Sequence, residues 1–169
     1  TGFHGVSRAG LELLLNPELG QDLDPIIKQR LIKAHQRPSP RLDVIKIWEN
    51  MNRDSRISGM DSSDGLADAI IQICRASGVG AEIYENAIPI LPSLSQLTGQ
   101  VLQWVLYGGE DFELVLCLPP SPARLLLEQL GEGAAIIGKI VPGGLVKLVN
   151  SQESPTPIIL SLSEGFQHF

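Results

Sequence analysis

Residues 60–65 read MDSSDG, a short turn that carries two aspartates, Asp61 and Asp64, directly before a long apolar segment. Side-chain oxygens at such a position can accept hydrogen bonds from the first N–H groups of a helix. Carboxylates are also the ligands that hard cations such as Mg²⁺ prefer, and a helix N-terminus favours phosphate. The turn therefore predicts either a helix cap or a site for a metal ion and a phosphate group.

The segments on both sides of the turn indicate a strand, a turn and a helix. Downstream, apolar residues recur at helical spacing from Leu66 through Ile70 and Cys74, and Gly78 follows as a C-terminal cap. This spacing predicts a helix over 66–77. Upstream, RISGM (56–60) predicts a short strand at a buried sheet edge, although it is polar for such a strand. The two aspartates would then lie where the strand passes into the helix.

The rest of the chain alternates between helical and extended patterns. Helices are predicted over 7–16 with Ser7 as the N-cap, over 25–36 with Asp24 as the N-cap, and over 42–51, most of 92–109, and 121–131. Strands are predicted over 80–85, 111–118, 134–141, 144–150 and 156–162, with polar turns at 52–55 and 142–144. The PGG turn at 142–144 predicts that its two flanking strands pair. The fold class is α/β (α+β), a layered mixed β-sheet covered by helices.

Composition limits the function classes. The chain has 169 residues, of which 43% are hydrophobic, enough for the core of one domain. A net charge of -6 without a Lys/Arg run argues against nucleic-acid or membrane partners. Cys74 and Cys117 form no C-x-x-C pair, which argues against a disulfide framework or a zinc site. No apolar run approaches the roughly 20 residues of a membrane span. A cytoplasmic protein is expected.

A second acidic cluster lies in LYGGEDFEL (106–114), where two glycines precede Glu110 and Asp111. Glycines permit close backbone approach or a positive φ, and the acids lie at the mouth of a predicted strand. The alternative is a glycine turn with solvated acids. His4, His35 and His168 share no metal-ligand spacing and rank as structural or exposed residues.

Four segments together resemble a known family. DSSDGLAD (61–68), ASGVGAEI (76–83), YGGEDFELVL (107–116) and GFQHF (165–169) resemble, in this order, the second half of the thiamine-monophosphate kinases. That family belongs to the superfamily of aminoimidazole ribonucleotide synthetase and selenophosphate synthetase. TGFHGVSRAGL (1–11) and RPSPRLDV (37–44) extend the resemblance to nearly the whole chain. The resemblance implies one C-terminal-type domain over 1–169, without the N-terminal domain that carries much of the ATP and metal site.

The resemblance also implies an activity and a role for individual residues. The family transfers the γ-phosphoryl group of ATP to thiamine monophosphate, which gives thiamine diphosphate. By position in the motifs, Asp61 and Asp64 bind Mg²⁺, Ser63 contacts ATP, Glu110 contacts thiamine monophosphate, and Phe169 stacks on the thiamine rings. Asp111 would support its neighbour. No catalytic base is expected, because the acceptor phosphate is already an anion.

The implied partners are ATP, thiamine monophosphate, Mg²⁺ and the absent N-terminal domain, in an enzyme that is a homodimer at full length. The chain alone would be inactive or nearly so. Ser62 departs from the family pattern, which commonly has an aliphatic residue there. Two other functions stay open: an ATP-dependent member of the superfamily with a different acceptor, and a non-catalytic ligand-binding or scaffolding domain in which the acids are helix caps.

Overall fold

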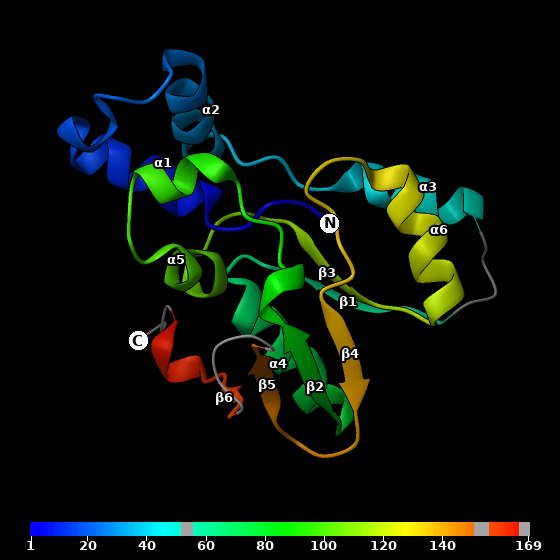
Figure 1. Cartoon of the computed structure of the whole chain (residues 1–169). Helices are drawn as coiled ribbons and strands as arrows, with labels where there is room; N and C mark the ends of the chain where they lie inside the picture. The colour runs from blue at the N-terminus through cyan, green and yellow to red at the C-terminus, as the bar shows by residue number, and fades with distance from the viewer. Residues whose placement is uncertain (52–55, 151–155, 166–169) are drawn as a thin grey trace.

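The computed structural model describes residues 1–51, 56–150 and 156–165. Within these residues the chain forms a four-stranded mixed sheet, a two-stranded ribbon and six α-helices (Figure 1). This arrangement confirms the predicted layered mixed α/β class. The helices are α1 (Val6–Leu15), α2 (Pro25–Gln36), α3 (Leu42–Met51), α4 (Leu66–Ser77), α5 (Val101–Tyr107) and α6 (Pro120–Leu130), with short 3-10 turns η1 (Pro17–Gly20), η2 (Glu85–Ala87), η3 (Pro92–Gln96) and η4 (Leu162–Glu164). The strands are β1 (Ser58–Asp61), β2 (Gly80–Tyr84), β3 (Leu114–Cys117), β4 (Gly138–Val141), β5 (Val146–Val149) and β6 (Ile158–Ile159).

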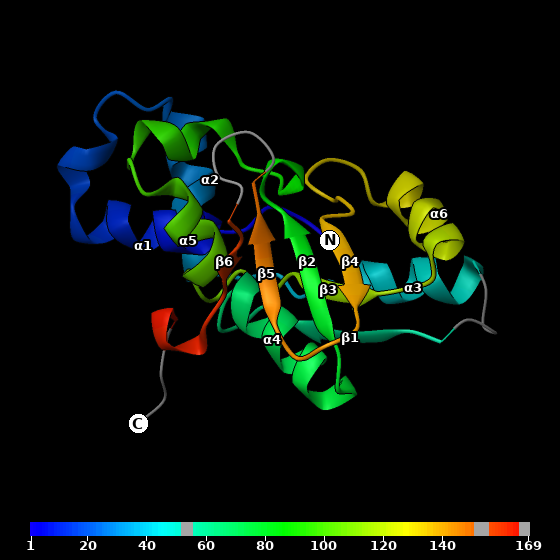
Figure 2. The same ribbon diagram turned by 60° about the horizontal axis from the view of Figure 1, so that its bottom comes forward.

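The four-stranded sheet has the order β4-β2-β5-β6, which contradicts the predicted pairing across the PGG turn (Figure 2). β2 lies between the two strands that were expected to pair, antiparallel to β4 and parallel to β5. The connection crosses the start of β2, where the Leu145 carbonyl accepts a hydrogen bond from the Ala81 N–H at 3.1 Å. Gly80 permits the crossing, because a Cβ there would lie 2.5 Å from the Leu145 oxygen.

Helix α4 lies between the two sheets and is the centre of the core. It contacts the ribbon of β1 and β3 on one side and strands β2 and β5 on the other. Leu66, Ile70 and Cys74 are buried as their spacing predicts, and α4 ends at Gly78 with a φ of 66°. β1 confirms the predicted strand before the turn, but its residues are mostly exposed rather than buried. The turn at 60–65 is thus held by a strand at one end and a buried helix at the other.

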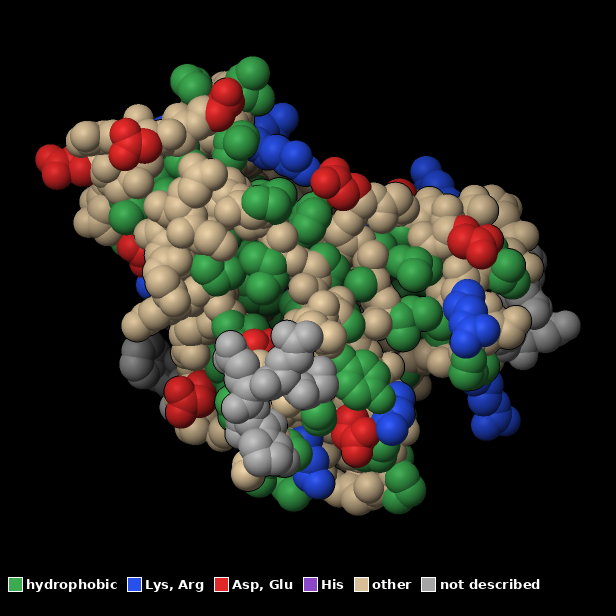
Figure 3. Space-filling view, viewed as in Figure 1, with side chains coloured by type: hydrophobic (Ala, Val, Ile, Leu, Met, Phe, Trp, Pro, Cys, Tyr) green, Lys and Arg blue, Asp and Glu red, His purple; other side chains and the backbone are tan. Residues whose placement is uncertain are grey.

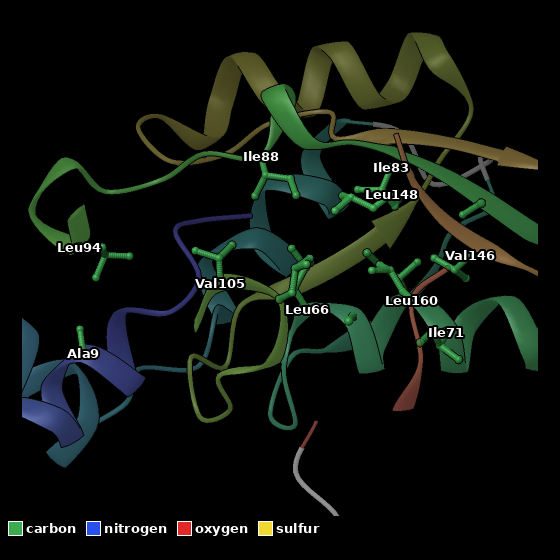
Figure 4. Close-up of a cluster of buried hydrophobic side chains, with 14 of the residues drawn as sticks. Ala9, Leu66, Ile71, Ile83, Ile88, Leu94, Val105, Val146, Leu148 and Leu160 are labelled. Atoms are coloured by element: carbon green, nitrogen blue, oxygen red, sulfur yellow. The ribbon is translucent and has the colours of Figure 1, made fainter. Parts of the chain in front are cut away.

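The hydrophobic core joins α4 to the four-stranded sheet (Figure 4). Leu66 at the start of α4 lies near Val105 of α5, and Ile83 and Leu148 project from neighbouring strands toward α4. Leu66 and Leu148 are each only 2% exposed. Since full burial of such a side chain contributes about 1.5–3 kcal/mol, this core fixes the start of α4 firmly.

Helices α1 and α2 pack closely at one end of the molecule. At Gly10 of α1, an added Cβ would clash with the Leu31 carbonyl oxygen and lie 2.9 Å from the Cβ of His35. The lack of a side chain at Gly10 therefore lets the middle of α1 pack directly against the C-terminal half of α2. α2 begins as predicted, with the Asp24 side chain accepting hydrogen bonds from the N–H groups of Ile26 and Ile27.

Several predicted boundaries were wrong. α1 begins at Val6 with Gly5 at the N-cap position, so Ser7 is not its cap. The expected long helix over 92–109 is η3 followed by the shorter α5. β3 begins at Leu114 rather than at 111, because Glu110 and Phe112 have φ values of 69° and 52°, which no strand accommodates. The turn predicted at 52–55 lies outside the described residues.

Candidate functional site

The two acidic clusters form one site through contacts between their backbones. The Glu110 N–H donates a hydrogen bond to the Ser63 carbonyl at 2.7 Å. At Gly109 an added Cβ would lie 2.7 Å from the same carbonyl oxygen, and at Gly65 it would lie 3.0 Å from the Leu106 oxygen. The two loops therefore approach at distances that only glycine permits.

The turn at 60–65 does not use its acids as the N-cap of α4. Gly65, with a φ of 108°, occupies the N-cap position, so neither Ser63 nor Asp64 does. The turn is closed instead by the Gly65 N–H, which donates to the Ser62 carbonyl at 3.1 Å. Asp61 is exposed at the end of β1, whereas Ser63 and Asp64 are half-buried. The structure thus argues against the interpretation in which Ser63 or Asp64 is the N-cap of α4.

Hydrogen bonds of Ser62 hold the turn in place. Its side chain is fully buried, and its Oγ lies 3.0 Å from Nε2 of His4 and donates to the Glu113 carbonyl at 3.2 Å. Burial lowers the pKa of His4 to about 3, so the ring is neutral and the contact is a hydrogen bond rather than an ion pair. A hydroxyl at this position, where the family pattern has an aliphatic residue, therefore has a partner supplied by this chain.

Asp111 caps α1 from across the fold. Its Oδ2 accepts a hydrogen bond from the Gly5 N–H at 2.6 Å, and its Oδ1 accepts one from the Ser7 N–H at 2.8 Å. Burial raises the pKa of Asp111 to about 6, against the opposing effect of these N–H groups. The residue beside Glu110 is thus tied to α1. No local pattern in the sequence predicts this cap, because the partners are 104–106 positions apart.

Replacing Asp111 with asparagine is expected to change how stability depends on pH. A folded-state pKa raised from 3.8 to about 6 means that the folded chain binds the Asp111 proton more tightly than the unfolded chain. The resulting contribution is complete below pH 4, is lost as the pH rises to 6, and amounts to about 3 kcal/mol. Urea unfolding at several pH values should therefore show the native chain losing stability relative to Asp111→Asn over this range. A difference that is constant or grows with pH would contradict the burial effect.

Glu110 is presented on a strained backbone. Its side chain is 60% exposed and its φ of 69° is in the left-handed region, which costs a residue other than glycine on the order of 1 kcal/mol or more. Its Oε2 lies 3.3 Å from Nδ1 of His35, and the same nitrogen lies 3.0 Å from the Ser7 Oγ. Sequence reasoning ranked His35 as structural or exposed. Nothing in its spacing indicated that α2 brings it to Glu110.

An ion pair holds the strand that enters the site. Arg41 Nη1 donates to Oε2 of Glu113 and to the Thr1 carbonyl, both at 2.6 Å. The Thr1 Oγ1 donates to the same Glu113 oxygen at 2.6 Å. Because these groups are largely shielded from solvent, they fix the backbone between Asp111 and β3.

The residues of the turn fit part of a magnesium site. Asp61, Ser63 and Asp64 supply the hard oxygen donors that Mg²⁺ prefers. In the described part of the chain, however, no three His, Cys, Asp or Glu residues lie together in a way that could hold a metal ion. Two carboxylates of this kind hold Mg²⁺ only together with phosphate oxygens, water or ligands from elsewhere.

The segment near residue 165 approaches the turn from another direction. A Cβ at Gly165 would lie 3.7 Å from Cδ1 of Tyr107 and 4.0 Å from the Asp64 carbonyl oxygen. Phe169, the predicted aromatic of the substrate site, lies outside the described residues, as does His168.

A largely apolar cavity of about 440 Å³ lies beside the site. It is lined by parts of α4, β2, β3 and α6 and by residues 133–140, and it reaches Leu66 and His4. Asp61, Asp64 and Glu110 are not among its lining residues. Figure 3 shows hydrophobic side chains across the middle of one face of the molecule, with most charged side chains toward its edges. The cavity is therefore distinct from the acidic site.

The free cysteines Cys74 and Cys117 both line this cavity, and burial raises the pKa of each thiol.

None of the described helices is long and apolar enough to cross a bilayer.

Comparison with known proteins identifies related chains. The family model described as AIR synthase related protein, C-terminal domain, matches residues 4–150. Thiamine-monophosphate kinase of Synechococcus elongatus is 49% identical over 172 residues, which cover 100% of this chain and 50% of that protein. The enzyme of the same name from Bacillus subtilis is 40% identical over 174 residues, which cover 100% of this chain and 51% of that protein. The chain thus spans about half the length of the curated relatives it matches.

Among solved structures, AaThiL complexed with AMPPCP and TMP matches with a TM-score of 0.69 and 29% identity. The match covers 94% of this chain and 49% of AaThiL.

Proposed function

Because the chain belongs to the family described as AIR synthase related protein, C-terminal domain, we propose that it forms half of an ATP-dependent thiamine-monophosphate kinase. The proposed reaction transfers the γ-phosphoryl group of ATP to the phosphate of thiamine monophosphate, giving thiamine diphosphate and ADP. Two relatives of that name, 49% and 40% identical, support the reaction. The complex of AaThiL with TMP and AMPPCP, an ATP analogue, supports both substrates.

The observation that carries the proposal is the hydrogen bond between the Glu110 N–H and the Ser63 carbonyl at 2.7 Å. It joins the motif to which the resemblance assigns metal and ATP contacts to the motif to which it assigns the thiamine contact. Phosphoryl transfer requires donor and acceptor to be held side by side and in line. A direct backbone link between the two motifs meets this requirement.

On the donor side, Asp61 and Asp64 would hold Mg²⁺ and Ser63 would contact a phosphate of ATP. When bound, the metal ion neutralises the repulsion between the phosphate groups and helps to align them. The two carboxylates extend from a turn whose buried Ser62 is bonded to His4 and to the Glu113 carbonyl, so their backbone is held in place before any ligand arrives. The N-terminus of α4, which begins directly after the turn, adds a favourable potential for phosphate.

On the acceptor side, Glu110 would contact thiamine monophosphate through its carboxylate, and its side chain is 60% exposed. Thiamine carries a cationic ring, so a nearby carboxylate attracts it electrostatically, and Phe169 would stack on the same rings. No side chain is assigned as a base, because the acceptor oxygen is already ionised.

The remaining parts of the site are proposed to come from outside this chain. The relatives are about twice as long, and further ligands for ATP and Mg²⁺ are assigned to an N-terminal domain. The proposal therefore treats residues 1–169 as a C-terminal-type domain of a cytoplasmic enzyme that would be a homodimer at full length.

A chimera tests the proposal. The 169-residue chain would replace the matching half of the Synechococcus elongatus enzyme, and conversion of thiamine monophosphate to the diphosphate would be measured with ATP and Mg²⁺. Activity is expected in the chimera and not in the chain alone. A folded chimera that transfers the γ-phosphoryl group of ATP only to another acceptor would overturn the proposal. So would a folded chimera that binds neither ATP nor thiamine monophosphate.

A further inference from the structure

We propose that His35 is a positioning residue, which holds the Glu110 carboxylate in the orientation that receives the cationic part of the substrate. The inference deepens the proposed function and rests on it. Its basis is a chain of contacts from Ser7 through His35 to Glu110, which joins α1, α2 and the loop before β3.

One ring nitrogen of His35 faces both Glu110 and Ser7. Nδ1 of His35 lies 3.3 Å from Oε2 of Glu110 and 3.0 Å from Oγ of Ser7. The Ser7 Oγ is hydrogen-bonded to this nitrogen, and the Glu110 carboxylate lies in close contact with the same nitrogen. Nδ1 is thus the nitrogen that acts on Glu110.

The His35 ring is well placed to orient a partner because its own position is over-determined. Ser7 is 1% exposed, and its N–H is bonded to Asp111, the residue next to Glu110. Gly10 brings the Cβ of His35 close against α1. The contacts therefore form a closed path from Glu110 to His35, then to Ser7 and Asp111, and back to Glu110.

The path leaves Glu110 available to a ligand. The His35 side chain is 20% exposed, but that of Glu110 is 60% exposed, so only part of the carboxylate is covered. A contact in which one partner is largely exposed contributes little to folding stability. Its larger effect is to reduce the number of rotamers that Glu110 must give up when substrate binds, which improves binding without changing the chemical step.

The test uses the active chimera and measures KM for each substrate separately from kcat. Replacing His35 with alanine is expected to raise KM for thiamine monophosphate about tenfold, while kcat and KM for ATP change by less than about twofold. His35→Asn places an amide nitrogen near the position of Nδ1 and should restore most of the affinity. His35→Gln places its amide near the position of Nε2 and should not.

A double-mutant cycle separates positioning from a general structural role. If His35 acts through Glu110, then His35→Ala should have less than about a twofold effect in a chimera that already carries Glu110→Gln. An equal loss in both backgrounds, or a parallel rise in KM for ATP, would overturn the inference. So would an unchanged KM for thiamine monophosphate in His35→Ala. If the unsubstituted chimera failed to phosphorylate thiamine monophosphate, the proposed function would be overturned as well. If the unsubstituted chimera is active but the His35 variants behave otherwise than expected, only the inference about His35 is overturned.

Discussion

Replacing both Asp61 and Asp64 with asparagine is expected to lower kcat/KM of the chimera for thiamine monophosphate by at least about 1000-fold. Asparagine retains an oxygen but removes the negative charge, so a turn that binds Mg²⁺ would lose most of its affinity for the ion. Steady-state assays over a range of Mg²⁺ concentrations would show the loss, together with a higher Mg²⁺ requirement for any remaining activity.

The same substitutions separate a ligand site from a structural turn. Asparagine is as good as aspartate at a helix N-cap, so acids that served only as caps would tolerate the change. Gly65, moreover, occupies that position. The matched control is Asp22→Asn, an exposed aspartate in the loop between η1 and α2, which should leave activity unchanged. A folded double variant that retains activity within about tenfold would refute the metal assignment.

Replacing Gly109 with alanine is expected to have the second largest effect. The added Cβ would lie 2.7 Å from the Ser63 carbonyl oxygen, a backbone atom that cannot turn aside as a flexible side chain can. The two loops must then separate, which weakens the hydrogen bond from the Glu110 N–H. We expect a loss of about 1–3 kcal/mol in the free energy of unfolding and a fall in kcat/KM of about 100-fold, since donor and acceptor sites shift relative to each other.

Gly99→Ala is the matched control for this prediction, because nothing lies within 4 Å of the Cβ that it would add. It should change the free energy of unfolding by less than about 0.5 kcal/mol and leave activity intact. Urea unfolding and kinetic assays on both variants provide the comparison. If Gly109→Ala behaved like Gly99→Ala in both measurements, the close contact of the two loops would not matter for function.

Local signals in the sequence predicted the helices well. α2 begins at Pro25 after the Asp24 cap, α3 covers 42–51, and α4 covers 66–77 with Gly78 as its C-cap. Each of these features depends on residues within one or two helical turns of each other, so a short stretch of sequence is enough to predict it.

Pairing of strands was the least predictable part of the fold. The segments 134–141 and 144–150 flank a turn that is typical of a hairpin, yet β2 inserts between the two strands. Proximity in sequence favours hairpins, but the final order depends on which strand the core buries most completely. Ala81 and Ile83 of β2 are 1% and 4% exposed, and Val146 and Leu148 of β5 are 4% and 2% exposed, so the two most buried strands are the two inner strands of the sheet.

In the candidate site, too, some features could be predicted from local sequence and others depend on long-range contacts. The motifs at 60–65 and 106–114 can be recognised from residue types alone, because the chemistry of carboxylates and glycines does not depend on the fold. The contacts that shape the site are long-range: His4 with Ser62, Asp111 with Gly5, and His35 with Glu110. Single residues such as His4 and His35 have no spacing that could have predicted these partners.

By itself, the sequence determined the α/β class and most helix boundaries and picked out the acidic residues of the candidate site, because hydrophobic period, capping and residue chemistry are local properties. Only the tertiary structure decided that the two acidic loops meet at Ser63 and Glu110, that Asp111 caps α1, and that His35 reaches Glu110. Those contacts form because burial of α4 and close packing at Gly10 bring distant segments together, and that is a property of the whole core.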